Sequence, residues 1–227
     1  LSFNWLVQPA AVRFPSGVLP PVVLGGPGGA TADVTFTAPG LYDVDLLVDD
    51  GRLAALTNQL VAVLPTGQRV GELAVDWGFA CPTDNCSATF VDEPDGLDGT
   101  QVHMSTNSAF DFAMFAPATQ DLAFDASTST ALGFFVRARN LNQYAWQGNY
   151  PVVVLASAAG EIRFEPDAAL LPKSPAEWFW LSLPLAGGAG WTRVDDGAAL
   201  SQVDWVELRA DTWAAGFDIW VDGLSIY

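Results

Sequence analysis

Hydrophobic and polar residues alternate along most of the chain in short runs, and turn-forming residues interrupt these runs roughly every ten positions. Alternation of this kind is typical of β-sandwiches and barrels, because successive side chains of a strand point to opposite faces of the sheet. No long amphipathic helix is expected, so we predict an all-β protein. The expected strands are 32–39, 40–51, 56–65, 100–106, 129–139, 151–157, 161–166, 178–185, 203–211 and 217–227.

A domain boundary is expected at 64–68. There the third strand pattern ends at Pro65 and Gly67, and a new pattern starts at 70–77. We therefore predict two domains, 1–66 and 67–227, joined by a linker too short to let them tumble freely.

The first domain carries the marks of a sandwich module. Trp5 stands ahead of a turn and would fill the centre, while Tyr42, Val44 and Leu46 alternate onto one face. Together with Thr35–Pro39, Gly40–Gly51 and the closing strand 56–65, these features resemble the later part of a PKD-like, immunoglobulin-type domain. The resemblance implies a partial immunoglobulin-like β-sandwich that serves as a spacer.

This resemblance is incomplete, because members of that family begin with two further strands and an Asp/Gly/Ser-rich turn that the sequence does not contain. Without those strands, one edge of the sandwich is expected to present unpaired backbone groups. Three explanations stay open at this stage. The chain was cut, or upstream chain was removed but stays paired, or another subunit supplies a strand.

The second domain shows an ordered set of features. It has an expected central strand at 129–140, a hairpin at 151–164 whose turn holds Gly160, Trp178 and Pro184 within 177–191, and two last strands at 203–210 and 217–227. This set resembles the galactose-binding-like jelly rolls found among carbohydrate-binding modules. The resemblance implies a jelly-roll β-sandwich that binds a glycan and has no catalytic role.

Charge and cysteine content limit the partners and the compartment. With 9 Lys+Arg against 26 Asp+Glu, the formal charge is −17, which disfavours nucleic acid and anionic membranes as partners. No apolar run approaches the roughly 20 residues that span a bilayer, and the first residues lack the pattern of an export signal, so we expect a mature or trimmed product. A local disulfide between Cys81 and Cys86 is preferred over a zinc site, since His103 is the only histidine. We expect a secreted or cell-surface bacterial protein.

Acidic residues crowd the stretch 92–99, which also holds two glycines. Calcium takes six to eight oxygen ligands, and clustered carboxylates on a turn supply them, although the spacing here is not that of an EF-hand. The resemblance to jelly rolls that bind a structural calcium adds an acidic residue of the last strand. The alternative is an ordinary solvated turn. The expected ligands are Asp92, Glu93, Asp95, Asp98 and Asp222.

Aromatic side chains beside amides form the second candidate site, because flat rings stack on the apolar faces of sugars while amides bind the hydroxyls. The alternative for each ring is a lid over the edge of the core. Trp5, Trp77, Trp178, Trp205 and Trp220 lie in strand-like runs and are predicted to be core. The predicted carbohydrate-binding residues are Tyr144, Trp146, Tyr150, Asn142, Gln147, Trp191 and Trp213.

Catalysis is disfavoured. His103 is expected to be a half-buried strand residue, no nucleophile or metalloprotease motif is present, and carboxylate pairs carry no information in so acidic a chain. The sequence thus favours a non-catalytic extracellular carbohydrate-binding module with a β-sandwich spacer, stabilised by calcium. The alternative is a structural or adhesive surface subunit, part of an assembly or filament, whose incomplete first module is completed by another chain.

Overall fold

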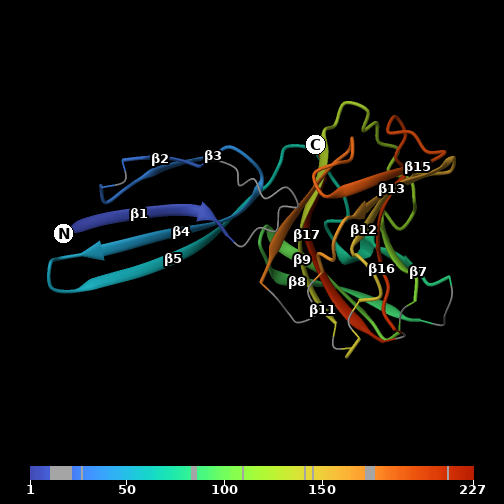
Figure 1. Ribbon diagram of the computed structural model, residues 1–227, viewed down its shortest axis with the longest axis horizontal. Coiled ribbons are helices and arrows are strands. Elements are labelled where there is room, and N and C mark those ends of the chain that lie inside the picture. Colours follow the sequence, from blue (N-terminus) through green and yellow to red (C-terminus); the bar gives the residue numbers. More distant parts are fainter. Residues whose placement is uncertain are drawn as a thin grey trace. The chain divides into compact units, whose positions relative to one another are not determined.

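The computed structural model describes residues 1–10, 22–26, 28–82, 86–108, 110–140, 142–144, 146–171, 177–213 and 215–227 (Figure 1). Strands dominate these residues, and the helical element described among them is the 3₁₀ turn Ala74–Asp76. The predicted all-β class is therefore confirmed. The chain divides into two units, Leu1–Pro65 and Thr66–Tyr227, each with its own strand pairing.

The first unit contains an antiparallel sheet in the order β1-β4-β5, made of β1 (Ser2–Pro9), β4 (Gly40–Asp49) and β5 (Ala54–Val63). A separate hairpin pairs β2 (Val22–Gly25) with β3 (Asp33–Phe36). The indole Nε1 of Trp5 donates to the carbonyl of Gly29 at 3.0 Å. The Phe36 ring lies 4.7 Å from that of Tyr42, which is fully buried. These contacts join the β2–β3 segment to one face of the sheet.

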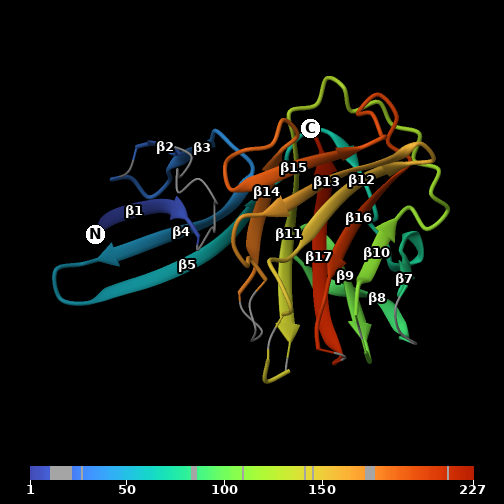
Figure 2. The same ribbon diagram turned by 45° about the vertical axis from the view of Figure 1, so that its right-hand side comes forward.

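The second unit is a β-sandwich, as predicted, built from two larger sheets (Figure 2). One has the strand order β15-β13-β12-β16-β10-β7, and the other has the order β14-β11-β17-β9-β8, with β6 paired to β17. The strands are β6 (Gln68–Arg69), β7 (Gly78–Ala80), β8 (Ala88–Gly96), β9 (Gly99–Thr106), β10 (Phe112–Ala116), β11 (Ala131–Asn140), β12 (Val152–Ser157), β13 (Gly160–Pro166), β14 (Phe179–Pro184), β15 (Trp191–Asp196), β16 (Trp205–Ala210) and β17 (Phe217–Ile226).

The core of this sandwich follows from the alternation seen in the sequence. The core contains the side chains of Ile162 and Phe164 from β13, and those of Val206 and Leu208 from β16. The residues between them on each strand therefore point outward. Side chains of the other sheet, such as Phe134 of β11, pack into the same core. The β15-to-β7 sheet therefore buries one face and presents the other to the surroundings.

Four tryptophans lie where the sequence did not place them, and two of these, Trp5 and Trp178, were expected in the core but are half-buried. Trp191, expected as an exposed glycan-binding ring, is only 2% exposed and belongs to the core. That interpretation was wrong, because pairing of Trp191 with Pro166 makes it the first residue of β15 rather than part of a loop. Trp205, expected in the core, is half-buried at the start of β16.

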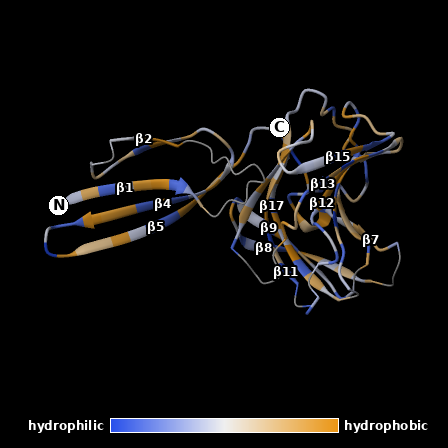
Figure 3. Ribbon diagram, viewed as in Figure 1, coloured by the Kyte–Doolittle hydropathy of each residue, from blue (hydrophilic) through white to orange (hydrophobic). Residues whose placement is uncertain are grey.

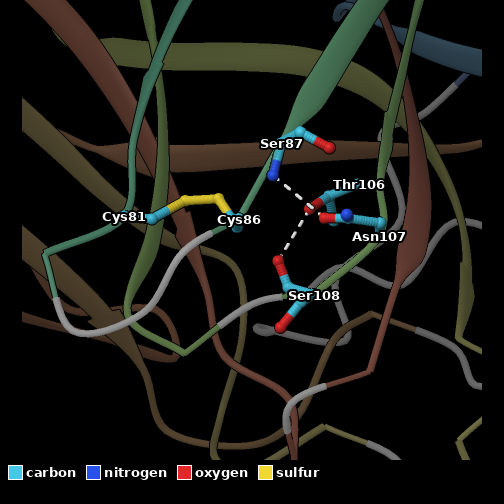
Figure 4. The surroundings of a disulfide bond; sticks show 6 residues. All are labelled: Cys81, Cys86, Ser87, Thr106, Asn107 and Ser108. Atoms are coloured by element: carbon cyan, nitrogen blue, oxygen red, sulfur yellow. Dashed lines mark hydrogen bonds between the residues drawn. A yellow bond between two sulfur atoms is a disulfide. The ribbon is translucent and has the colours of Figure 1, made fainter.

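A disulfide joins Cys81 to Cys86 across a separation of five residues, with the Cα atoms 6.1 Å apart (Figure 4). Both cysteines are partly buried against the core. Beside the bridge, the backbone N–H of Ser87 donates to Oδ1 of Asn107 at 2.9 Å. The disulfide thus ties together the two ends of the segment between β7 and β8.

Candidate functional site

A row of charged side chains crosses the outer face of the β15-to-β7 sheet. On β13, the Arg163 guanidinium contacts Glu165 at 2.6 Å and Glu161 at 2.8 Å. From β16, Arg209 contacts the same Glu161 at 2.5 Å and also pairs with Glu207. Strands β13 and β16 both pair with β12, so Arg209 reaches over β12 to Glu161. The row is therefore a connected network across three strands.

The protonation states within this network follow from its geometry. Burial alone would raise the pKa of Glu161, but hydrogen bonds from Arg209 and Arg163 outweigh it and hold the pKa below its usual range. Burial disfavours the charged form of Arg209 too, and alone it would lower the pKa of this guanidinium. Contacts with Glu161 and Glu207 outweigh burial and raise that pKa. Glu161, Arg163 and Arg209 are therefore ionised at neutral pH, and their contacts fix these side chains in place.

Two depressions in this face adjoin across the network. One has a volume of about 480 Å³ and the other about 340 Å³, and both are lined by Glu207 and Arg209. We call the two together the sheet groove. The larger is also lined by Ala80, Pro82, Asp111, Ala113, Phe115, Gln120, Tyr150 and Ala210, and the smaller by Ala156, Ser157, Gly160, Glu161, Asp196 and Trp205.

Each half of the sheet groove contains aromatic side chains. Phe115 and Tyr150 line the larger depression, and Trp205 lines the smaller one. The indole Nε1 of Trp205 donates to Glu207 at 3.3 Å, which ties this ring to the charged network. The groove thus has rings toward both ends and ionised groups between them.

Tyr150 sits in a negative field. Burial is the main cause that raises the pKa of its phenol to about 12, and the carboxylates of Asp211, Asp111 and Glu165 raise it further. The hydroxyl therefore stays protonated at any physiological pH and is able to donate a hydrogen bond.

Glycine is required at the turn that borders the smaller depression. Gly160 has a φ of 149°, and a Cβ added there would lie 1.9 Å from the backbone oxygen of Asp196. The sequence placed Gly160 in the turn of a hairpin, and the pairing of β12 with β13 through Ser157 and Gly160 agrees. The close approach lets β15 contribute Asp196 to the groove.

The predicted aromatic loop separates into exposed and packed rings. Tyr144 and Trp213 are 66% and 50% exposed, and their rings form an edge-on pair at 6.2 Å. Trp146 is partly buried, with its ring 5.0 Å from that of Phe217. Of the predicted rings, Tyr150 belongs to the sheet groove.

The side chain of Asn142 and the backbone of Gln147 form hydrogen bonds that hold this loop in place. The backbone N–H of Tyr144 donates to Oδ1 of Asn142 at 3.0 Å. The backbone N–H of Gln147 donates to the carbonyl of Asp211 at 2.9 Å, which joins the loop to the end of β16. The Tyr144–Trp213 pair therefore lies in two neighbouring loops, the one that ends at Tyr150 before β12 and the one that follows β16. We call these two loops the loop cluster.

Neither protein-family profiles nor curated proteins match the sequence. Among solved structures, a family 11 carbohydrate-binding module of the cellulosomal cellulase Lic26A-Cel5E of Clostridium thermocellum is similar, at 13% identity and a TM-score of 0.45, over 73% of this chain and 95% of that one.

Two further solved structures are similar to this chain. A family 11 carbohydrate-binding module from Clostridium thermocellum in complex with a β-1,3-1,4-mixed-linked tetrasaccharide has 12% identity and a TM-score of 0.43, over 84% of this chain and 96% of that one. An exo-β-agarase has 10% identity and a TM-score of 0.46, over 70% of this chain and 25% of that one. At these values, any function must be argued from the residues of this chain.

The expected calcium ligands do not gather into one site. Asp92 accepts the backbone N–H of Ala74 at 2.7 Å, and Asp98 pairs with Arg69 at 2.6 Å. In the part of the chain that the structure describes, no three His, Cys, Asp or Glu side chains are arranged to hold a metal ion. As the structure places them, the five residues do not fit a calcium site, and the calcium expected from the sequence is put to the test by chelation.

Glu93 and Asp222 also have partners within the protein. Glu93 contacts Nδ1 of His103 at 2.8 Å and accepts the indole N–H of Trp220 at 3.0 Å. Asp222 is buried, which raises its pKa, and accepts the backbone N–H of Asp98 at 2.8 Å. His103 is the half-buried strand residue that the sequence predicted, since its side chain is 20% exposed.

Chelation with EDTA is therefore expected to leave the melting midpoint of the protein unchanged. Four of the five carboxylates already have protein donors, namely Asp92, Glu93, Asp98 and Asp222, so no ligand bond of theirs is expected to be lost when free calcium is removed. Differential scanning calorimetry with excess calcium and with EDTA measures this, because an ion bound only by the folded state raises the midpoint. A higher midpoint in calcium would show that these carboxylates rearrange around an ion.

Most of the residues of the sheet groove were not predicted from the sequence. Glu161, Glu207 and Arg209 were not singled out, and Trp205 was assigned to the core. A signal was present, since 161–165 and 205–209 both alternate polar and apolar residues. What the sequence does not show is that β13 and β16 both pair with β12, which brings the two polar sets onto one face.

Proposed function

We propose that this chain is a non-catalytic extracellular carbohydrate-binding module that holds a neutral polysaccharide along the sheet groove of its second unit. The observation that carries this proposal is the groove itself, an open depression with Tyr150 and Phe115 in one half, Trp205 in the other and a fixed charged network between them.

Sugars match the chemistry of this groove. A pyranose has an apolar face that packs on an aromatic ring, and its hydroxyls both donate and accept hydrogen bonds. Glu207 and Arg209 present carboxylate acceptors and guanidinium donors along the line between the rings. Because Arg163, Glu161 and Arg209 hold one another in place, little side-chain entropy is lost when a sugar binds.

The charge of the groove favours a neutral ligand. Its carboxylates outnumber its guanidiniums, and the carboxylates of Asp211, Asp111 and Glu165 add to the effect of burial, which is the main cause that raises the pKa of the Tyr150 phenol to about 12. A uronate or a sulfated sugar would meet repulsion there, whereas a neutral sugar would not. The overall charge of −17 acts in the same direction.

The network also favours binding over hydrolysis. A glycosidase uses one carboxyl group with a raised pKa as the acid, but the pKa of Glu161 is lowered by its two arginine partners. Glu165 and Glu207 are engaged by Arg163 and Arg209. Carboxylates held in this way suit hydroxyl recognition.

The first unit, in this proposal, is a PKD-like spacer, and the location is extracellular. The β1-β4-β5 sheet with its hairpin and the buried Tyr42 support a small sandwich-type module. The Cys81–Cys86 disulfide supports an oxidising compartment. No helix among the described residues is long and apolar enough to cross a membrane.

Affinity electrophoresis tests the proposal. Gels that contain neutral polysaccharides such as mixed-linkage β-glucan, xylan, mannan and galactan are expected to slow the protein in at least one case. Gels with polygalacturonate or alginate are expected not to slow it, because the groove repels anions. Retention by the anionic polymers alone would contradict the proposal, and so would migration unchanged by every neutral polymer.

A further inference from the structure

Strand β5 of the first unit is an edge with unusual exposure. In the sheet order β1-β4-β5 it lies at one side, and no strand among the described residues pairs with its outer edge. Residues 54–60 are exposed at every position, so both faces of the strand are open there. Its register with β4 is continuous over all ten residues of β5, from Ala54 to Val63, without a bulge.

The composition of β5 also leaves this edge unprotected. The strand reads AALTNQLVAV, with no charged residue, no proline and no glycine. Edges of natural sheets are usually blocked by charge, proline or a bulge, because an open edge pairs with further strands. The other edge, β1, ends in Pro9, which has no N–H to offer, and alternates between exposed and half-buried positions. The geometry therefore singles out β5.

The sequence of β5 is complementary to itself. When two antiparallel strands are related by a twofold axis perpendicular to the sheet, and the axis passes through Asn58, Leu56 of one copy lies opposite Leu60 of the other. In the same register Asn58 lies opposite Asn58, and Ala54 opposite Ala62. Moving the axis to Thr57 or Gln59 places Leu56 opposite asparagine or alanine instead.

We propose that β5 pairs antiparallel with β5 of a second copy of this chain, in the register centred on Asn58. The β1-β4-β5 sheets of two copies then form one continuous six-stranded sheet.

The neighbouring strand fits this arrangement. Leu47 of β4 lies opposite Leu56 within one copy, so the row becomes Leu47, Leu56 and the Leu60 of the other copy. These leucines are exposed at 36%, 69% and 37% in a single chain and would be covered by one another in the pair. The apolar and polar bands of β4 and β5 are visible in Figure 3.

The central row is polar and already ordered. The Nδ2 of Asn58 donates to Oδ1 of Asp45 at 2.7 Å and lies 3.4 Å from that of Asp43. Two such amides meeting at the axis favour this register over neighbouring ones. The aspartates stay one strand away from the axis, which keeps like charges apart at the contact.

Cysteine cross-linking tests the register. In the proposed pair, the two Asn58→Cys residues lie directly opposite each other with their Cα atoms roughly 4.5–5.5 Å apart, a separation that a disulfide spans. Mild oxidation is expected to yield a covalent dimer on non-reducing gels. The matched control is Ala54→Cys on the same face, since the two copies of residue 54 are eight positions out of register, roughly 26 Å apart. The described native cysteines are already paired and do not interfere.

Sedimentation velocity on the unmodified chain tests the association itself. The fraction of dimer is expected to increase with protein concentration. Leu56→Lys is expected to make the protein monomeric without changing its fold, because Leu56 is exposed in the single chain. A monomer at every concentration overturns the proposal, as do equal yields of cross-linked Asn58→Cys and Ala54→Cys. Glycan retention is expected to be the same for Leu56→Lys and the parent, so this test stands apart from the proposed function.

Discussion

The double variant Tyr150→Ala/Trp205→Ala is expected to lose measurable binding to the neutral polysaccharide that retains the parent protein. The two rings lie in opposite halves of the sheet groove, so together they remove the stacking surfaces toward both ends. Binding hot spots of this kind contribute about 2 kcal/mol or more each, so each single variant should weaken affinity by at least about tenfold. Isothermal titration calorimetry with an oligosaccharide of the retained polymer measures the change.

The matched control is Tyr144→Ala/Trp213→Ala. It also removes two aromatic rings, but these are the exposed pair on the loop cluster that the sequence favoured. We expect this variant to bind within about threefold of the parent. Near-ultraviolet circular dichroism confirms that each variant is folded. Loss of binding in the loop variant with retention in the groove variant would move the site to the loops.

Substitution of Arg209 by alanine is expected to lower the free energy of unfolding by about 2 kcal/mol and to weaken glycan binding. Removing this guanidinium leaves Glu161 and Glu207 close together without their shared partner. This loss of stability lies between the values typical of a buried and of an exposed ion pair, because the Arg209 side chain is 33% exposed. Urea denaturation followed by tryptophan fluorescence measures it.

The stability difference should depend on pH. The pKa of Glu161 is lowered in the folded protein from its ordinary value of 4.5, so the stability that its pairing contributes is present above 4.5 and is lost as the pH falls through the folded-state pKa. The parent and Arg209→Ala should therefore converge in stability in acid. Arg209→Lys keeps the positive charge but does not contact Glu161 and Glu207 at the same time, so it should lose less stability than Arg209→Ala. An unchanged difference down to acidic pH would show that the loss comes from packing instead.

The strands of the second unit were predictable from the sequence because their alternation is strong. In 161–166 and 206–210, apolar residues fall on every second position, and the structure buries them. The turn at Gly160 was predictable for a local reason, since the chain adopts a φ there that favours glycine. Local patterns of this kind need no knowledge of which strands pair.

Strand pairing decided the rest. Trp191 follows a glycine run and resembles a loop residue, but its pairing with Pro166 places it in β15 and buries it. Trp205 stands in an apolar run, but the register of β16 turns it outward with Glu207. In the acidic stretch, Asp92 accepts a hydrogen bond from the backbone of Ala74, and Glu93 contacts the ring of His103. None of these contacts follows from the order of residues alone.

The most direct test of glycan binding in the sheet groove is an NMR titration of the isotope-labelled protein with a neutral oligosaccharide from the retained polysaccharide. The account predicts that the largest shifts occur at the indole N–H of Trp205, the side chain of Arg209 and the amides around Tyr150, which line the two depressions. Shifts confined to the loops that carry Tyr144 and Trp213, with the groove unchanged, would contradict it.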